Sequence, residues 1–144
     1  MTVYRTHQVS VQPVNATGNE GGTSSYTAGG TTSSGTHTFQ WSKSDNGVDY
    51  NTIPGATNAT YTTPALVFAD DNDDRFKCTL SLVGAELDLT STFAVQTVLR
   101  VITISQQPQP QTVIEGQTAT FSITAAITSG SINYQWQKSV DSGN

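Results

Sequence analysis

The sequence predicts an all-β protein in which two sheets pack face to face as a β-sandwich. Its composition is one reason: 24 Thr and 15 Ser stand among 144 residues, only 12% of which are charged. β-Branched side chains such as Thr pack well on the pleated surface of a strand. Short alternating segments separated by turn residues are the second reason, and a third is that no run of ten or more residues has apolar positions at helical spacing.

One phrase of the sequence occurs twice, and it indicates an internal repeat. Phe39–Ser44 reads FQWSKS and Tyr134–Ser139 reads YQWQKS, so the two tryptophans, Trp41 and Trp136, lie 95 residues apart. The same offset, without a gap, aligns Gln12-Pro13 with Gln107-Pro108, Glu20-Gly21 with Glu115-Gly116, Tyr26 with Phe121, and Ser34-Gly35 with Ser129-Gly130. The repeat predicts one complete module, residues 1–98, followed by the first half of a second, truncated module, residues 99–144.

The expected strands follow from period-two alternation, and the expected turns from Gly, Pro, Asn and Asp. In the first copy we expect a weak strand ending at Tyr26 and Ala28, a loop over AGGTTSSGT, a strand around Trp41, and strands over 59–63, 75–83 and 86–98. Turns are expected at Asp45-Asn46-Gly47 and Ile53-Pro54-Gly55. In the second copy we expect strands over 101–105, 118–124 and 132–138, with the proline-broken QQPQPQ as a connection.

The alternation also predicts which residues face the core. Phe76, Cys78, Leu80 and Leu82 share one face of the segment 75–83, and the segment 86–98 carries Leu87 and Leu89, then Phe93 and Val95. The tryptophans are predicted to be core residues and not sugar-stacking platforms, because each alternates with an aromatic residue and the pattern is repeated. The predicted structural core comprises Trp41, Phe76, Cys78, Phe121 and Trp136.

Composition excludes several classes of function. The formal net charge is −5 and the six Lys and Arg are scattered, whereas a nucleic-acid binder needs clustered basic residues. No segment approaches membrane-spanning length, and the N-terminus lacks the pattern of a signal peptide. Because Cys78 is the only cysteine, no disulfide forms within the chain, which favours folding in a reducing cytoplasm. With His7 and His37 interpreted as isolated and no catalytic or phosphate-loop spacing, we predict neither an enzyme nor a cofactor.

The acidic run Asp70–Asp74 has two interpretations. Its carboxylates could hold Ca²⁺, with Asp71 and Asp73 as candidate ligands. The other interpretation is a solvated loop entering the next strand, because Asp and Asn favour turns. The sequence favours the loop, since the ligand alternation and glycine of an EF-hand are missing. We therefore predict no metal site. Two triplets, Asn15-Ala16-Thr17 and Asn58-Ala59-Thr60, have the form of N-glycosylation acceptors, but such triplets arise by chance in a Thr-rich chain.

These residues resemble the immunoglobulin-like fold. Trp41 and Trp136 stand where the core tryptophan of strand C stands in that fold. ADDNDDRFKCTLSL resembles the turn into strand F, Asp-x-Gly-x-Tyr-x-Cys, with its places assigned to Asp71, Asp73, Phe76 and Cys78. The sequence departs from the pattern because Phe76 lacks the tyrosine hydroxyl, Asp73 replaces the glycine, and the partner cysteine is replaced by Ala28 and, in the second copy, Ile123. The resemblance makes residues 99–144 strands A to C of the second module.

The stretch WSKSDNGVDYNTIPGATNATYTTPAL resembles a narrower group, the immunoglobulin-like modules of tailed-bacteriophage virion proteins and some bacterial surface proteins. The matching residues are Trp41, Ser44, Gly47, Ile53, Gly55, Ala56, Thr57, Thr60 and Tyr61. The resemblance covers about residues 6–144. It implies a structural virion protein assembled in the host cytoplasm: a capsid decoration, fibre or tail-associated protein. Its implied partners are other virion proteins, further copies of itself, and host-surface glycans bound weakly.

Two alternatives to the virion hypothesis remain at this stage. One is a secreted bacterial adhesin, and the other is an accessory domain of a glycan-processing enzyme. The second module also leaves two possibilities open. Either the chain is a fragment of a longer tandem array, or another chain supplies the missing strands. In both cases the half-module is expected to expose its apolar residues, and the short apolar junction 98–105 is expected to join the modules stiffly.

Overall fold

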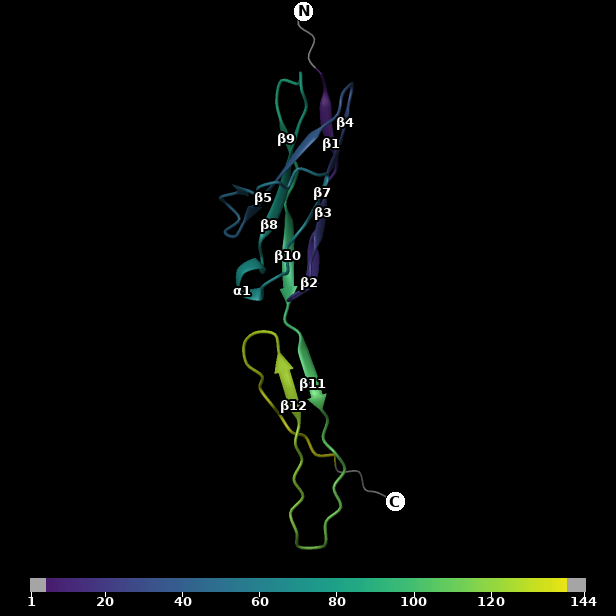
Figure 1. Ribbon diagram of the computed structural model, residues 1–144, viewed down its shortest axis with the longest axis vertical. Coiled ribbons are helices and arrows are strands. Elements are labelled where there is room, and N and C mark those ends of the chain that lie inside the picture. Colours follow the sequence, from purple (N-terminus) through teal and green to yellow (C-terminus); the bar gives the residue numbers. More distant parts are fainter. Residues whose placement is uncertain (1–4, 140–144) are drawn as a thin grey trace, which may run out of the picture. The chain divides into compact units, whose positions relative to one another are not determined.

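The computed structural model describes residues 5–139, and residues 1–4 and 140–144 lie outside the described part. Contacts within the chain divide it into two units, residues 1–99 and 100–144. Strands dominate the first unit, whereas the described part of the second unit has two short strands and is otherwise irregular (Figure 1). The helix of the described part is a single turn, α1 (Phe68–Asp71), in the first unit. The first unit is a two-layered β-sandwich, as the composition and alternation predict.

One layer of the first unit is formed by four short strands. They are β1 (His7–Val11), β3 (Ser25–Thr27), β4 (Gly29–Thr32) and β7 (Thr60–Thr62). β1 pairs antiparallel with β4, and β3 pairs antiparallel with β7. Only Ala28 separates β3 from β4, and its N–H donates to the carbonyl of Ala59 at 2.9 Å, so the two pairs continue into one another.

The other layer is a sheet in the order β2-β10-β8-β5-β6, with β9 also paired to β8. Its strands are β2 (Ala16–Asn19), β5 (Thr38–Ser44), β6 (Asn51–Thr52), β8 (Arg75–Ser81), β9 (Leu89–Thr90) and β10 (Ala94–Leu99). β10 runs parallel to β2, and the remaining pairs are antiparallel. In the long β5–β8 pair Trp41 lies opposite Cys78. The sheet therefore brings the tryptophan strand against the clearest alternating strand of the sequence.

The core lies between these layers. β8 buries every second residue, Phe76, Cys78 and Leu80, and leaves the residues between them partly exposed. Trp41 is fully buried, and its indole N–H donates to the carbonyl of Asn58 at 2.9 Å. The members of the core cluster are Tyr26, Ala28, Trp41, Phe76, Cys78, Leu80 and Ala94. Burying a large aromatic side chain of this kind is worth about 1.5–3 kcal/mol.

The single strand expected over 86–98 forms as two separate strands, β9 and β10. Leu87 and Phe93 are 73% and 47% exposed, whereas Ala94, Gln96 and Val98 of β10 are buried. The break between β9 and β10 thus decides which residues of the segment face inward. At this break Ser91 satisfies the backbone groups of Cys78 on β8. The Ser91 N–H donates to Cys78 O at 2.8 Å, and Ser91 Oγ accepts from Cys78 N.

The predicted loop AGGTTSSGT is also partly wrong, because Gly29–Thr32 form β4. A Cβ on Gly30 would lie 2.8 Å from the carbonyl oxygen of Gln8 and 2.9 Å from Leu80 Cδ2. The glycines therefore permit a close strand approach here, and they do not mark a loop.

The second unit contains one antiparallel pair, β11 (Ile102–Gln106) with β12 (Thr124–Ile127). The strands expected over 118–124 and 132–138 do not form, apart from Thr124 itself. The corresponding segments of the first unit, β3 and β5, pair with β7, β6 and β8. Those partners have no counterpart among the described residues of the second unit, and a strand without a partner is not stable.

The β11–β12 pair repeats the β1–β4 pair residue by residue at an offset of 95. His7 lies opposite Thr32, and Ile102 lies opposite Ile127. The register shift between Val9 and Val11 recurs between Ile104 and Gln106. The left-handed glycines recur as well, because Gly35 and Gly130 have φ angles of 89° and 88°. The offset found between sequence motifs is thus also the offset between two hydrogen-bonding patterns.

Candidate functional site

A buried carboxylate and a lysine meet where β5 ends and β8 begins. Lys43 follows Trp41 by two residues, so its stem starts on the inward side of β5, and its side chain is 35% exposed. Asp74 precedes Phe76 by two residues and is 1% exposed. The antiparallel pairing of β5 with β8, in which Ser44 lies opposite Arg75, brings the two side chains together.

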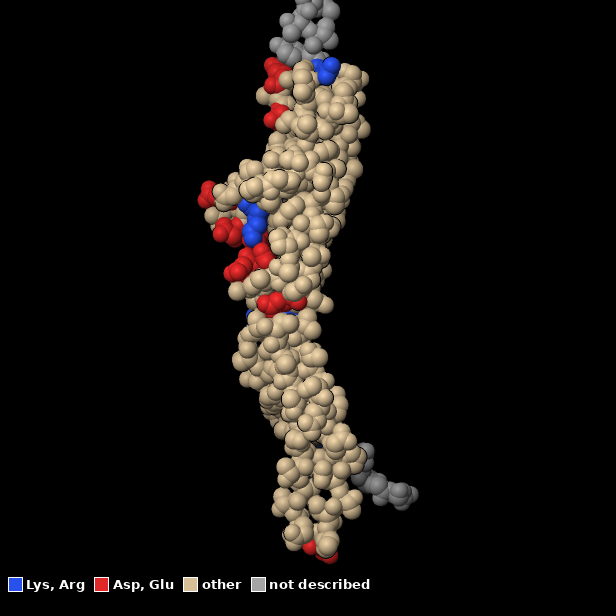
Figure 2. Space-filling view, viewed as in Figure 1, with Lys and Arg blue, Asp and Glu red and all other residues tan. Residues whose placement is uncertain are grey.

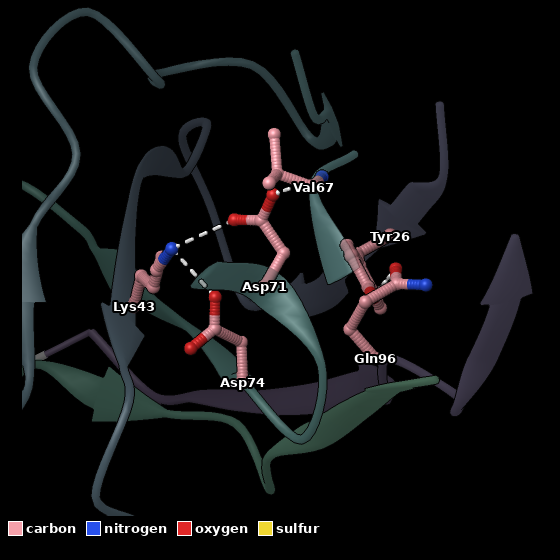
Figure 3. Close-up of polar contacts among 6 residues, drawn as sticks. All are labelled: Tyr26, Lys43, Val67, Asp71, Asp74 and Gln96. Carbon is pink, nitrogen blue, oxygen red and sulfur yellow. Dashed lines mark hydrogen bonds and ion pairs between the residues drawn. The ribbon is translucent and has the colours of Figure 1, made fainter. Parts of the chain in front are cut away.

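The Lys43 ammonium is shared by two carboxylates, as Figure 3 shows. Its Nζ lies 3.0 Å from Asp71 Oδ1 and forms an ion pair with Asp74 Oδ2. Among the described residues no well-aligned hydrogen-bond donor reaches Asp74 Oδ2, so the ion pair is what compensates for its burial. Asp71 Oδ2 also accepts from the N–H of Val67 at 2.8 Å, which fixes the start of α1. The cluster of Lys43, Asp71 and Asp74 therefore ties β5 to α1 and to the start of β8.

The protonation states follow from burial and charge. Burial raises the pKa of Asp74 and outweighs the opposing effect of the Lys43 charge. Burial by itself would lower the pKa of Lys43, but its hydrogen bonds and charge interactions with Asp74 and Asp71 raise that pKa above its usual range. Lys43 is therefore charged at neutral pH. It is neither a nucleophile nor a general base there, because both roles require the free amine.

A second buried polar pair lies close to the cluster. The Tyr26 hydroxyl donates to Gln96 Oε1 at 2.6 Å, and the two residues are 1% and 0% exposed (Figure 3). Gln96 Nε2 donates in turn to the carbonyl of Thr97 at 2.7 Å. Burial, followed by the charge of Asp74, raises the pKa of Tyr26 far above its ordinary value. The phenol therefore stays neutral, and the pair acts as a hydrogen-bonded strut across the core.

The metal candidates of the sequence do not form a site. Asp71 is ion-paired with Lys43, whereas the carboxylate of Asp73 accepts from Asn72 Nδ2 at 3.0 Å. Within residues 5–139 no group of three or more His, Cys, Asp or Glu is arranged to hold a metal ion. Asp73 has another role, because its φ of 70° makes it the left-handed residue of the turn into β8.

The interpretation of the acidic run as a solvated loop is wrong for its last residue, Asp74, which is buried. In the strand-F motif, the aspartate and glycine positions were also assigned one residue too early, to Asp71 and Asp73. Counting back from Cys78, the pattern Asp-x-Gly-x-Tyr-x-Cys puts its glycine at Asp74 and its aspartate at Asn72. The alternation of β8 carried back by two residues would have placed Asp74 inside. Sequence reasoning also missed Lys43, Tyr26 and Gln96, whose partners lie far away along the chain.

The histidines interpreted as isolated are in contact. His7 Nδ1 lies 3.3 Å from His37 Nε2, and the planes of the two rings are 20° apart with their centroids separated by 5.4 Å. His7 reaches this position from β1, and His37 precedes β5 by one residue. Their separation of 30 residues is bridged by β4, which pairs with β1.

The second unit exposes the residues that the first unit buries. Phe121 and Trp136 are 50% and 52% exposed, whereas their counterparts Tyr26 and Trp41 are 1% and 0% exposed. Phe121 and Trp136 therefore line an open apolar hollow and are not enclosed as core residues in the described unit. The exposure is explained by the strands at hand, since none corresponding to β7 and β8 is among the described residues of this unit.

Charged side chains are sparse on the face of the molecule drawn in Figure 2. In the face drawn in Figure 2, most of the surface is neither acidic nor basic, and the visible basic side chains lie beside acidic ones. None of the helices in the described part is long and apolar enough to cross a membrane.

One family model matches this chain, over residues 9–72, and it describes a domain of unknown function (DUF8696). The match covers less than half of the chain, from β1 to the end of α1. No curated protein matches the sequence.

Solved structures similar to this chain include two of Sidekick-1. Its immunoglobulin domains 1–4, crystal form 1, match with a TM-score of 0.52 and 15% identity over 72% of this chain and 27% of that one. Its immunoglobulin domains 1–5 match with a TM-score of 0.51 and 15% identity, over 84% and 25% of the two chains. The tandem Ig repeats of Dlar match with a TM-score of 0.48 and 16% identity, over 85% and 66%.

The chain thus spans about a quarter of the length of the Sidekick-1 structures. At this identity the likeness concerns the fold and not the activity. It agrees with the layer order described above and with the core tryptophan on β5. The protein has the immunoglobulin-like β-sandwich fold.

Proposed function

We propose that this chain is a non-enzymatic structural protein of a tailed-bacteriophage virion, built from tandem immunoglobulin-like modules. The tandem arrangement is supported by one observation: β11 pairs with β12 in the same register as β1 pairs with β4, at an offset of 95 residues. The register shift within the pair is repeated as well. Two segments that share motifs, glycine conformations and pairing register are best explained as two copies of one module. On this proposal the complete module is residues 1–98, and residues 99–144 are strands A to C of the next.

The charged and polar clusters of the first unit support a structural role. Lys43 is held as an ammonium between two carboxylates, and Cys78 and the Tyr26 hydroxyl are buried. These three groups are thus neutralised or enclosed, and none of them is available as a nucleophile or base. A module of this kind contributes shape, stiffness and surface loops, and its partners recognise these. The partners we propose are other virion proteins, further copies of the chain, and weakly bound host glycans.

The virion assignment rests on the sequence between Trp41 and Tyr61. The residues of this motif have defined places in the fold. Gly47 and Gly55 adopt φ angles of 75° and 74° at turns, and Trp41 packs against Tyr61 with ring centroids 6.2 Å apart. The motif thus reflects requirements of packing and of turns. It identifies the type of module more specifically than it identifies the protein in which the module occurs.

Location in the assembled particle tests the proposal. An antibody raised against the full chain would be used for immunogold labelling of purified phage particles, and the same particles would be analysed by mass spectrometry. We expect labelling at regular sites on the capsid or tail and several copies of the chain per particle. Labelling of the envelope of uninfected bacteria would point to an adhesin. Recovery of the chain only within a glycan-processing enzyme would point to an accessory domain, and either result would overturn the proposal.

A further inference from the structure

His7 and His37 form a pair whose hydrogen bonds fix which nitrogen is free. His7 Nε2 lies 2.7 Å from the carbonyl oxygen of Leu87, and this oxygen can only accept. The proton of neutral His7 is therefore on Nε2, and its Nδ1 presents a lone pair toward His37 Nε2 at 3.3 Å. A histidine that donates its other N–H to a backbone carbonyl is the usual arrangement around a bound metal ion.

The distance between the two facing nitrogens fits a shared tetrahedral ion. Two Zn–N bonds of about 2.0–2.1 Å, separated by a tetrahedral angle, place their nitrogens about 3.3 Å apart. The observed separation of His7 Nδ1 and His37 Nε2 is 3.3 Å. Both side chains are half-buried, so the scaffold holds the rings while solvent can complete the coordination. Imidazole nitrogen favours zinc, copper and nickel over calcium and magnesium, which prefer oxygen.

The fold makes room for this pair at one position. A Cβ on Gly30 would lie 2.9 Å from His37 Cε1, so the ring can lie there only because residue 30 is glycine. At the offset of 95 the counterparts of His7, His37 and Gly30 are Ile102, Ile132 and Ala125. The two histidines and the glycine are thus replaced together in the second copy. The module architecture does not require a histidine pair, and the pair is a feature specific to the first unit.

From these observations we infer a binding site for one borderline divalent transition-metal ion, with His7 Nδ1 and His37 Nε2 as the protein ligands and solvent completing the tetrahedron. In the absence of metal, His37 Nε2 donates its proton to His7 Nδ1. Metal binding releases that contact, and His37 shifts its proton to its other ring nitrogen. The ion would join β1 to the segment that leads into β5. This inference is independent of the virion proposal.

The test titrates the full chain with ZnCl2 and compares it with CaCl2. We expect one Zn²⁺ per chain by calorimetry, an increase in Tm of several degrees at saturating Zn²⁺, and no effect of Ca²⁺. His37→Gln keeps a donor for His7 Nδ1 but removes a ligand, so it should bind Zn²⁺ at least about tenfold more weakly. The double variant His7→Ile/His37→Ile copies the second repeat, should remain folded, and should lose the Zn²⁺ response.

Nitrogen NMR of the imidazole rings provides a readout that does not depend on stability. Without metal we expect His7 to be protonated at Nε2, and with Zn²⁺ we expect both facing nitrogens to shift. If Zn²⁺ produces no heat and no ring shift, the inference is wrong and the pair is an ordinary hydrogen bond. If the Zn²⁺ response survives in both variants, the ion binds elsewhere and the inference is equally overturned.

Discussion

Lys43 offers the sharpest test of the first unit at the scale of single residues. Replacing it with Met leaves the buried carboxylate of Asp74 without its counter-ion. Removing one partner of a buried ion pair costs roughly 3–5 kcal/mol, and we expect about 2–3 kcal/mol here because Lys43 is one-third exposed. Denaturant unfolding at neutral pH measures this difference. Lys138→Met is the matched control, since Lys138 is the repeat counterpart of Lys43 and is exposed.

The same variant should show a defined pH dependence. Burial raises the pKa of Asp74 in the folded chain, and removing the Lys43 charge raises it further. A carboxyl group whose folded pKa is raised stabilises the fold below its unfolded pKa of about 4, and this contribution is lost as the pH rises through the folded pKa. The stability difference between wild type and Lys43→Met should therefore grow between about pH 4 and pH 7. A difference independent of pH would contradict the assignment of Asp74.

Tyr26→Phe tests the buried strut to Gln96. The change leaves Gln96 Oε1 without its donor, which should cost about 1–3 kcal/mol. Because the folded pKa of Tyr26 is raised, the wild type loses stability as the pH rises above about 10, where the unfolded phenol ionises. The Tyr26→Phe variant should not show this contribution to the loss of stability at alkaline pH. Unfolding curves at about pH 8 and pH 10.5 separate the two effects, with Tyr50→Phe as a control outside the core.

Cys78 should report unfolding. Its side chain is fully buried, and burial raises the pKa of the thiol to about 11. Because the thiolate is the reactive form, a thiol reagent at about pH 8 should label Cys78 only after denaturation. Rapid labelling of the native chain would show that β8 opens readily or that the core is assigned incorrectly.

At the scale of elements, the close approach of β4 to β1 depends on Gly30. Gly30→Ala places a methyl group within 3 Å of the Gln8 carbonyl, the His37 ring and Leu80. Overpacking of this kind typically costs 1–3 kcal/mol, and NMR should show the His37 ring displaced. The reverse change in β12, Ala125→Gly, is the matched control and should cost no more than about 1 kcal/mol. Equal effects at the two positions would mean that the glycine serves no packing purpose.

The elements also show where prediction from the sequence worked. The alternation of β8 was readable because Phe76, Cys78 and Leu80 bury every second residue without interruption. The inward face of β10 was not readable from the sequence. The break after β9 changes which residues point inward, and the period-two pattern does not show where a strand breaks. β4 was missed because its glycines resemble a loop until the neighbouring strand is known. Local pattern thus identifies strands, and pairing decides their faces and limits.

At the scale of the whole molecule, the repeat can be tested by completing the second module. Ser139 is the counterpart of Ser44, so residues 45–99 can be appended after Ser139 in the repeat register. In the chimera Trp136 should become buried beside the copied β8, as Trp41 is in the first unit. In a Trp41→Phe background we expect its fluorescence emission to shift to the blue and to change in a cooperative unfolding transition. Emission typical of an exposed tryptophan would argue against two equivalent modules.

The sequence by itself determined the β class, the repeat of 95 residues and the strand that carries Trp41, because these depend on side-chain periodicity and on turns within a few residues. It did not reveal the ion pair of Lys43 with Asp74, the bond of Tyr26 to Gln96, or the contact of His7 with His37. Partners in these pairs stand about 30 to 70 residues apart. Only the pairing of strands brings them together, so the polar clusters that could give this chain a function were decided by the tertiary structure.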